Sequence, residues 1–530
     1  MRKITNILTV LTVVTSLFIG CTDLEEIPID GIAVDGSSGG GSAPDFRAVL
    51  NEVNAIYSEW NRQGGLNEMS GDAWAGPTRG GDWDDNAALR QIHTHTWAPD
   101  HVWLQQVFNI CLTGVFNADL LLADPSQSAD HAGAKFLKSW FYYRMISLFG
   151  KVPYRESYDD LTKDALVYSR QEALPIGVAL AEEALAGLPE TSGATNAHPD
   201  NILTKDAARM LLAKYHLNKA VFTSELGATE FTHDPADMTA VINYVNDMSA
   251  TLNTGVNDGS AYWKNFDIDN SESPEIIFSL ISILGGGARD ISDTRWYYFS
   301  GGHYNMTPGG WNGPVIVGEY YDYFQQNGVV EGSDPRVTFS RPDLVDNFST
   351  SADSGVGVGI LRGQQYAPGG TTPLEDRLGN PLTFMPINEL VMTSQSTIER
   401  QGFRARKYVP DARNIDNPAN DHIVYRYADA LLMRAEAVLR GGSGADAQAD
   451  LDAIRRRVGL GSISASIDNV YAERARELWL EGWRREDMIR YGTFLEAKFF
   501  KPSVSDTKYL LYSIPADALI NPNMTQNPGY

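Results

Sequence analysis

The stretch "VYAERARELWLEGWRREDMIRYG" (residues 470–492) mixes apolar and charged residues in a pattern typical of a long helix. In its second half, Arg484 stands three residues before Asp487, and Glu486 stands four residues before Arg490. Opposite charges at these spacings face each other on a helix and stabilise it. We therefore predict one helix over 470–492, and its charged residues need no catalytic role to explain them.

The segments before this stretch carry the same helical signal. "YRYADALLMRAEAVLR" (425–440) ends at two glycines and is followed by "DAQADLDAIRRRVGL" (446–460). Alanine interleaved with leucine lets two helices approach closely and interdigitate. Segments in the first half of the chain also space their apolar residues as helices do: 101–124, 132–150, 171–189 and 203–222. The predicted fold is mainly α, with helical hairpins that resemble tetratricopeptide repeats; periodicity alone leaves a generic helical bundle as the alternative.

Between roughly residues 250 and 420 the composition of the sequence changes. Clusters of Gly, Pro, Asn and Asp separate short apolar runs such as "EIIFSLISIL" (275–284), which is consistent with a buried strand. Long irregular segments in a compact protein usually carry function. We therefore expect this insertion between two helical blocks to contribute to a ligand site.

The N-terminal stretch "SLFIGCTDLEE" (16–26) predicts where the protein is located. Arg2 and Lys3 precede an apolar run that ends at Cys21, which is the order of a secretory signal and is too short to cross a membrane. The residues up to Cys21 resemble the bacterial lipobox, in which this cysteine is acylated; an ordinary signal peptide with an incidental cysteine is the alternative. Two or more acyl chains on one cysteine give stable anchoring. We therefore expect a lipid anchor at Cys21, and we see no later apolar stretch of about twenty residues.

Acidic residues follow the cysteine directly, at Asp23, Glu25 and Glu26. They resemble the export tag by which Bacteroidetes-type bacteria send lipoproteins to the outer face of the outer membrane, and a solvated acidic linker is the competing interpretation. A Gly- and Ser-rich run (34–45) then behaves as a flexible tether. The predicted location is the outer membrane, lipid-anchored and facing the cell surface.

Composition narrows the class of partner. The 530 residues include 43 Lys and Arg against 67 Asp and Glu, a formal net charge of −24. Such a surface repels nucleic acid, so no nucleic-acid partner is expected, whereas neutral ligands are compatible with it. With Cys21 acylated, Cys111 has no cysteine to pair with, and no disulfide framework is possible.

Several motifs occur in an order that resembles the SusD/RagB-like outer-membrane lipoproteins. In the C-terminal part the motifs are "YRYADALLMRAEAVL" (425–439), "LDAIRRRVGL" (451–460), "ERARELWLEGWRREDMIRYG" (473–492) and "SIPADALINPNMTQNPGY" (513–530). Earlier in the chain they are "KFLKSWFYYRMISLFGKVPY" (135–154), "TKDAARMLLAKYHL" (204–217) and "SPEIIFSL" (273–280). The resemblance covers nearly all of residues 45–530.

The resemblance implies a scaffold of four tetratricopeptide-like hairpins that carries an irregular ligand-binding portion. It further implies a protein without catalytic activity or cofactor that binds a glycan, sometimes a peptide, and passes it to a partner TonB-dependent barrel of the SusC type. A surface glycoside hydrolase and a peptide-binding RagB-like uptake protein are the alternatives. The expected organisation is a signal peptide (1–20), lipidated cysteine and linker (21–44), N-terminal helical region (45–230) and C-terminal region (231–530), the last with the insertion (250–420), helices (423–492) and a terminal strap (509–530).

Two stretches offer the aromatic planes, carboxylates and guanidinium groups that a sugar-binding surface needs. The first is "RWYYFSGGHYNMTPGGW" (295–311), with Trp296, Tyr297, Tyr304 and Trp311 as candidates. Successive side chains on a strand alternate between faces, so its run of aromatics cannot all face one core. We therefore expect some of them to be exposed; the alternative is that all pack against the scaffold.

The second stretch is "SGDAWAGPTRGGDWDDNAALRQIHTHTW" (70–97). Its candidate ligand-binding residues are Asp72, Trp74, Arg79, Trp83 and Trp97. Asp72 is a candidate because the resemblance places an early ligand-facing loop here, although Gly71 and Trp74 depart from the family's pattern. Trp296, Trp83 and Trp74 are the leading candidates of the two stretches, and Trp103 in the following segment is expected in the core.

Metal and catalytic sites have weaker support in the sequence. The spacing of His93, His95 and His101 fits no standard zinc site, and "GDWDD" is not a calcium loop, so no metal is expected. No phosphate loop or Cys/His pair is present. A carboxylate pair for glycoside hydrolysis depends on a separation in space that the sequence does not give.

Overall fold

The computed structural model describes residues 44–59, 62–158, 160–190, 203–286, 300–339, 358–367, 370–411 and 413–530. The predictions for the lipidated Cys21 and for the ligand-binding Trp296 and Tyr297 lie outside these described residues.

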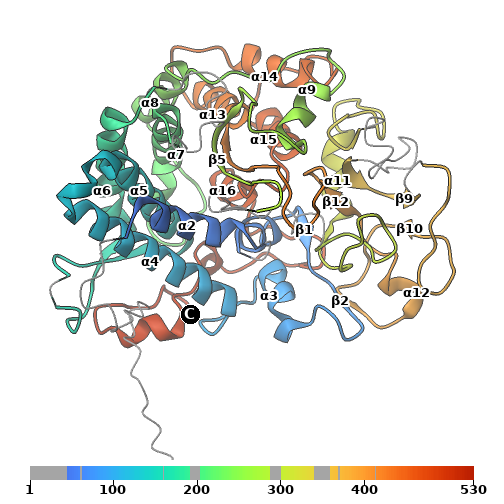
Figure 1. The fold of residues 1–530 in the computed structure, drawn as a ribbon, viewed down its shortest axis with the longest axis horizontal. Coiled ribbons are helices and arrows are strands. Elements are labelled where there is room, and N and C mark those ends of the chain that lie inside the picture. Colours follow the sequence, from blue (N-terminus) through green and yellow to red (C-terminus); the bar gives the residue numbers. More distant parts are fainter. Residues whose placement is uncertain are drawn as a thin grey trace, which may run out of the picture.

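The long helices of the first half of the chain pack against one another in chain order, on the left-hand side of Figure 1. They are α2 (Phe46–Tyr57), α4 (Val102–Ala123), α5 (His131–Leu148), α6 (Arg170–Gly187), α7 (Lys205–Thr223) and α8 (Pro235–Asn246). The short helix α3 (Ala88–Thr94) lies between α2 and α4 in the chain. The helical segments predicted over 101–222 are confirmed within a few residues at each end.

The helical row continues after the insertion. Helix α13 (Tyr427–Leu439) packs directly on α8, and α14 (Ala447–Arg456) and α15 (Ile467–Glu477) both contact α13. Within the described residues, the pairs α4/α5, α6/α7, α8/α13 and α14/α15 therefore follow one another, and the predicted scaffold of four helical hairpins is confirmed. In the third pair, the whole insertion lies between α8 and α13 in the sequence.

The prediction of one continuous helix over 470–492 is wrong. Helix α15 ends at Glu477 and α16 spans Arg484–Arg490, with Leu480 (φ 57°) and Gly482 (φ 84°) in the left-handed region between them. Glu68, in the buried π-helical turn Gly65–Met69, accepts hydrogen bonds from the backbone N–H groups of Gly482 (2.6 Å) and Trp483. A tertiary partner thus satisfies the donors that the interrupted helix leaves open, which outweighs the local helical signal.

Helix α4 is long and apolar enough to cross a membrane by length and composition, so the expectation that no such stretch follows Cys21 is wrong. It nevertheless packs between α2 and α5 and buries Trp103, Leu104, Val107, Phe108 and Leu121 in the main core. The expectation that Trp103 is a core residue is confirmed. The apolar character of α4 is explained by its contacts inside the scaffold.

Short strands, most of them from the insertion, lie among loops and the short helices α11 (Gly318–Tyr321) and α12 (Gln395–Ile398) on the right-hand side of Figure 1. Two ladders join the 70–80 region to the insertion: β1 (Trp74–Ala75) pairs antiparallel with β6 (Val315–Ile316), and β2 (Thr78–Arg79) pairs parallel with β11 (Val391–Met392). The predicted strand in 275–284 is confirmed as β5 (Ile276–Leu280), which pairs with β13 (His422–Arg426). The other ladders are β7 (Thr338–Phe339)/β8 (Val358–Leu361)/β12 (Arg404–Arg406), β9 (Gly363–Gln364)/β10 (Thr383–Phe384) and β3 (Lys151–Tyr154)/β4 (Leu166–Ser169).

Buried ion pairs fasten the insertion to the helical row. Arg426, at the end of β13, contacts Glu275 (2.8 Å), Glu477 (2.7 Å) and Glu481 (2.6 Å), and all four side chains are buried. Arg457 joins Glu275 to the same Glu477. Buried charges are tolerated only with paired, hydrogen-bonded partners, so this cluster fixes how the insertion and α15 meet.

Candidate functional site

The structure brings Trp83, Tyr304 and Trp311 into one region at the edge of the insertion. The indole N–H of Trp83 donates a hydrogen bond to the backbone carbonyl of Trp311, with 2.9 Å between N and O. The Trp83 ring lies against Gly313, where any side-chain Cβ would overlap it. Trp83 is half-buried, and Trp311 is 42 % exposed. Trp83 and the loop of Trp311, 228 positions later in the chain, therefore lie together, and we call the accessible surface of Trp83, Tyr304 and Trp311 the aromatic surface.

The backbone around the aromatic surface is held in unusual conformations. Trp83 (φ 62°), Asn86 (φ 52°) and Ala87 (φ 64°) lie in the left-handed region, as does Asn312 (φ 55°) beside Trp311. Non-glycine residues seldom occupy this region, which costs roughly 1–3 kcal/mol for each residue. Such conformations persist where the surrounding structure enforces them, and they concentrate at binding sites.

Backbone hydrogen bonds close the loop that carries Tyr304 and Trp311. The N–H of Gly310 donates to His303 O (3.0 Å), that of Asn312 to Gly302 O (2.7 Å) and that of Gly313 to Ser300 O (2.6 Å). A side chain at Gly310 would overlap the backbone of Gly302. The two strands of the loop thus lie in close contact, and the loop has a defined shape without regular secondary structure.

The guanidinium group of Arg377 packs on the ring of Tyr304. The guanidinium carbon of Arg377 lies 4.1 Å from the centre of the Tyr304 ring. The carboxylate of Glu399 accepts hydrogen bonds from the backbone N–H (2.8 Å) and the Nε (2.5 Å) of Arg377. It also accepts a hydrogen bond from His303 Nε2 (3.0 Å). Burial alone would raise the pKa of Glu399, but these hydrogen bonds lower it, so the carboxylate is charged. His303 Nδ1 accepts a hydrogen bond from the backbone N–H of Asn305, so the proton of the neutral ring is on Nε2. Burial lowers the pKa of His303 to about 4.

Two buried arginines lie beneath this surface without a carboxylate partner among the described residues. Arg79 donates to the backbone carbonyls of Gly313, Ile398 and Gln401, and burial lowers its pKa to about 9. Arg404 donates to Asn312 Oδ1 (2.7 Å) and to the carbonyls of Glu399, Gln401 and Gly402. Together they join the loop of Trp311 to the loop of Glu399. Both arginines therefore support the loops of the aromatic surface from beneath.

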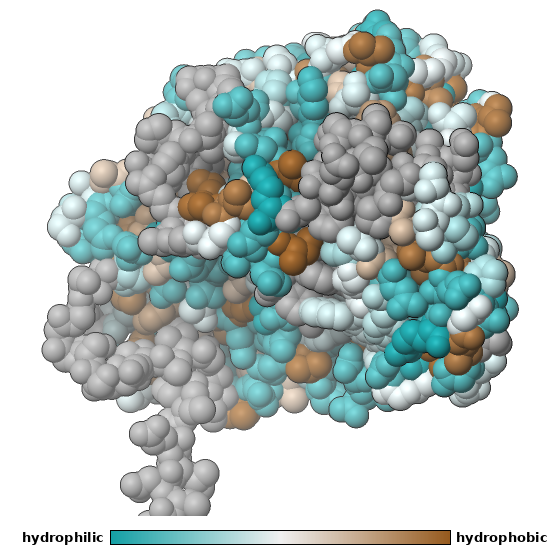
Figure 2. Space-filling view, turned by 45° about the vertical axis from the view of Figure 1, so that its right-hand side comes forward, coloured by the Kyte–Doolittle hydropathy of each residue, from teal (hydrophilic) through white to brown (hydrophobic). Residues whose placement is uncertain are grey.

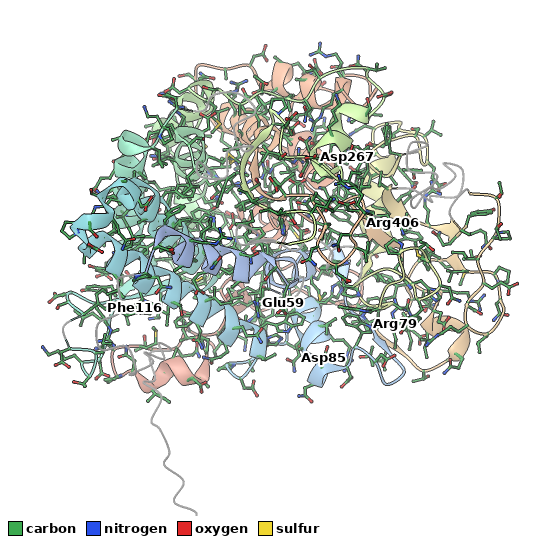
Figure 3. All side chains as sticks on the ribbon, in the orientation of Figure 1. Glu59, Arg79, Asp85, Phe116, Asp267 and Arg406 are labelled. Atoms are coloured by element: carbon green, nitrogen blue, oxygen red, sulfur yellow. The ribbon has the colours of Figure 1, made fainter. Side chains whose placement is uncertain are left out.

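Exposed polar groups border the aromatic surface. Asp82, Asp84 and Asp85 are exposed, and Asp84 is held by Arg90 at 2.9 Å. Figure 3 shows Asp85 at the bottom of the molecule, with Arg79 to its right and Phe116 of α4 on the left-hand side. The side chain of Arg377 is half exposed. Figure 2 shows this side of the molecule with hydrophobic residues in separate patches among hydrophilic ones.

The structure does not place the other sequence-predicted residues on the aromatic surface. Trp74 is 1 % exposed within β1, and Trp97 is 2 % exposed and donates to the Tyr530 hydroxyl (2.7 Å). Arg79 is 2 % exposed. Asp72 forms a bidentate ion pair with Arg484, and both N–O distances are 2.6 Å. Trp74, Trp97 and Arg79 are therefore buried away from the aromatic surface, and Asp72 pairs with α16; their role in ligand binding stays a prediction.

The alternating histidines hold loops together. The ring nitrogens of His93 lie 3.1 Å from Trp74 O and 2.8 Å from Phe499 O, and those of His95 lie 2.8 Å from Ser70 O and 2.9 Å from Ser505 Oγ. Burial lowers the pKa of His93 to about 3. Within the described part of the chain, no group of three or more His, Cys, Asp and Glu side chains is arranged to hold a metal ion.

Sequence reasoning missed His303, Arg377, Glu399 and Arg404, which shape the aromatic surface. They come from the insertion at positions that no spacing rule connects, and each meets the others only through the folded loops. The glycines of "TPGGWNGP" (307–314) were the available signal, because Gly310 and Gly313 mark places where backbone or a ring approaches closely.

Comparison with known proteins relates the chain to one family. The model of the SusD family matches residues 385–530. The starch-binding protein SusD of Bacteroides thetaiotaomicron is 23 % identical over an alignment that covers 96 % of this chain and 93 % of that protein. The predicted relationship to SusD/RagB-like proteins is confirmed.

Solved structures show the same fold. A laminarin-binding SusD-like protein superposes with a TM-score of 0.64 at 20 % identity, covering 92 % of this chain and 98 % of that one. Surface glycan-binding protein A from Bacteroides thetaiotaomicron, in complex with laminarihexaose, gives a TM-score of 0.64 at 17 % identity and covers 91 % and 98 % of the two chains. The chain therefore has the SusD-like fold over about nine-tenths of its length.

Proposed function

We propose that this SusD-related protein is a cell-surface glycan-binding lipoprotein that captures an oligo- or polysaccharide and delivers it to a partner TonB-dependent, SusC-like transporter in the outer membrane. The aromatic surface formed by Trp83, Tyr304 and Trp311 would bind the glycan. Trp296 and Tyr297 precede this loop directly in the sequence and are proposed to extend the surface.

The single observation that carries the proposal is the hydrogen bond from the Trp83 indole to the Trp311 backbone carbonyl, which brings the two tryptophans together beside exposed carboxylates and a half-exposed guanidinium. Indole faces suit the C–H faces of sugar rings, while the charged groups suit hydroxyls. The relatives named for starch, laminarin and glycan binding support the same class of ligand.

The relatives support a binding function without catalysis, because they are named for what they bind. The local chemistry agrees with it. A glycosidase acid needs a carboxyl group whose pKa is raised, whereas the pKa of Glu399, the buried carboxyl group behind Tyr304, is lowered. Release of reducing sugar during a long incubation with the bound glycan would instead establish the hydrolase alternative.

The anchor and the transporter belong to the proposal as well. A lipid at Cys21 would hold the protein at the membrane, and the linker (21–44) would let the folded part move over a neighbouring barrel. Co-purification of a TonB-dependent barrel with the lipidated protein from native outer membranes tests this partner. Recovery of the protein alone under conditions that retain other outer-membrane complexes would count against it.

The experiment for the glycan is native affinity electrophoresis of the chain in gels that contain laminarin, starch or another polysaccharide. We expect retardation in at least one gel, and we expect Trp83→Ala and Trp311→Ala each to weaken it at least tenfold. Trp311 is 42 % exposed, so its replacement should leave the fold intact. Unchanged mobility with a broad polysaccharide panel, together with binding of a peptide mixture, would replace the glycan by a peptide ligand.

A further inference from the structure

The turn between β9 and β10, on the right-hand side of Figure 1, carries Arg377 and is fixed in place. Within the turn, Asp376 accepts hydrogen bonds from the backbone N–H of Asn380 (2.9 Å) and from its side-chain amide (3.2 Å). Asn305, in a loop that belongs to the aromatic surface, donates from Nδ2 to Glu375 O (2.8 Å). The turn therefore has a defined shape and a defined position beside the aromatic surface.

The guanidinium group of Arg377 is held at one edge and open at the other. Its Nε donates to Glu399 (2.5 Å), and its carbon lies 4.1 Å from the centre of the Tyr304 ring. Its Nη1 and Nη2 have no acceptor among the residues that the structure describes, and the side chain is 50 % exposed. A long surface side chain loses rotamer freedom when it binds a ligand, but these contacts already restrict Arg377. The structure therefore offers a fork of N–H donors in a fixed position.

The charges around Arg377 decide which kind of ligand it suits. The buried, charged Glu399 compensates the guanidinium charge. Desolvation would lower the pKa of Arg377, but the hydrogen bond and charge of Glu399 and the nearby charge of Asp82 raise it. Asp82 and Asp85 are exposed and form no ion pair among the described residues. The border of the aromatic surface is therefore negative overall, which disfavours uronate or sulfate groups and leaves Arg377 to act as a hydrogen-bond donor.

We propose that Arg377 contacts the glycan directly, that its Nη1 and Nη2 donate to two neighbouring oxygen atoms of a neutral sugar, and that Glu399 positions it. The inference rests on the proposed function and adds a ligand class to it, namely a glycan without uronic acid or sulfate groups. Because the guanidinium group covers one face of Tyr304, a sugar on this side meets Arg377 and not that face of the ring. The fixed spacing of the two nitrogens restricts which pairs of oxygens fit, so Arg377 contributes specificity as well as affinity.

The test is isothermal titration calorimetry of the full chain with soluble neutral polysaccharides, among them laminarin and starch, and with polygalacturonate as the acidic member. We expect at least one neutral polymer to bind and polygalacturonate not to bind. Arg377→Ala should weaken that binding about tenfold, as expected when a charged donor is removed. Arg377→Lys keeps the charge but lacks the fork, so it should weaken binding severalfold.

Arg413→Ala is the matched control. The side chain of Arg413 is 45 % exposed and is held by Asp411 through its Nε (2.9 Å) and its backbone N–H (3.0 Å), as Arg377 is held by Glu399. It lies beside Ile268, whose neighbour Asp267 is in the upper part of Figure 3, whereas the aromatic surface lies over Arg79 in the lower right. The control variant should bind like wild type.

Glu399→Gln tests the positioning role. The amide keeps the size of the side chain but loses its charge, so Arg377 is held less firmly and binding should weaken severalfold. The double variant with Arg377→Ala should bind no more weakly than Arg377→Ala alone, because Glu399 acts through Arg377. Additive losses would overturn the positioning role.

Salt separates a neutral ligand from a charged one. Binding of the neutral polymer should be equal at ionic strengths of about 0.01 M and about 1 M, because no ligand charge is screened. Binding of polygalacturonate alone, weakened by salt, would overturn the ligand class. Equal binding of a neutral polymer by wild type and Arg377→Ala would overturn this inference and leave the proposed function standing. Absence of binding to every polysaccharide would overturn both.

Discussion

The indole N–H of Trp83 donates to the backbone carbonyl of Trp311, a residue 228 positions later in the chain. The contact needs Gly313, because the Trp83 ring occupies the space that a side chain at that position would take. A single hydrogen bond and one glycine therefore hold the Trp83 indole against the backbone of the Trp311 loop.

Gly313→Ala should displace the Trp83 ring and weaken polysaccharide binding. The added Cβ would overlap both the ring and Ser300 O, and overpacking of this kind costs about 1–3 kcal/mol. Affinity electrophoresis and thermal unfolding would measure the two effects. The matched control is Gly81→Ala in the neighbouring turn, where a Cβ meets nothing within 4 Å. Equal behaviour of both variants would show that the Trp83–Gly313 contact does not position the indoles.

Arg426→Met should strongly destabilise the protein. The change leaves Glu275, Glu477 and Glu481 with less compensating charge in a buried setting, and breaking a buried pair costs about 3–5 kcal/mol. Urea unfolding would measure the loss. Lys135→Met removes one partner of the exposed Lys135–Glu183 pair and should cost less than about 1 kcal/mol. Similar losses for the two variants would mean that the buried cluster does not fasten the insertion.

Glu68→Gln should change how stability depends on pH. Burial raises the pKa of Glu68 to about 8, partly offset by the hydrogen bond from the Gly482 N–H. The unfolded chain releases this proton near pH 4.5, whereas the folded protein keeps it until about pH 8. Stability from this group is therefore lost as pH rises through that window, by up to ~1.4 kcal/mol per pH unit.

The measurement is the free energy of unfolding of wild type and Glu68→Gln at pH 5, 6.5 and 8. We expect the variant to gain stability relative to wild type as the pH rises. Buried histidines such as His93, whose pKa is lowered to about 3, act in the opposite direction but contribute equally to both proteins. Parallel pH profiles would show that Glu68 is ionised in the folded state.

Cys21→Ser should release the protein from the membrane fraction, since the acyl chains would have no thiol to join. Detergent phase partitioning and mass spectrometry of the mature N-terminus would measure this. Cys111→Ser is the control, because Cys111 is buried in α4 and burial raises the pKa of its thiol to about 12, so it is unreactive. Membrane retention of the Cys21→Ser protein would contradict a lipid anchor at this residue.

The helical scaffold could be predicted because its signals are local. The spacing of apolar residues in α4, α5, α6 and α7 follows the helical repeat, and alanine marks the close contacts. The break after α15 could not be predicted, because hydrogen bonds from Gly482 and Trp483 to Glu68, more than 400 residues earlier, decide it. A local pattern cannot report a partner so distant in the chain.

The candidate site also combines features that local sequence determines with features that depend on distant partners. The sequence by itself determined that aromatic residues gather in two stretches, 70–97 and 295–311, and that each stretch is rich in glycine. Only the tertiary structure decided that Trp83 and Trp311 share a surface while Trp74 and Trp97 are buried. The reason is physical: exposure depends on which strands pair and which loops close over a ring, and here those partners, including Gly313, Arg79 and Arg404, come from distant parts of the chain.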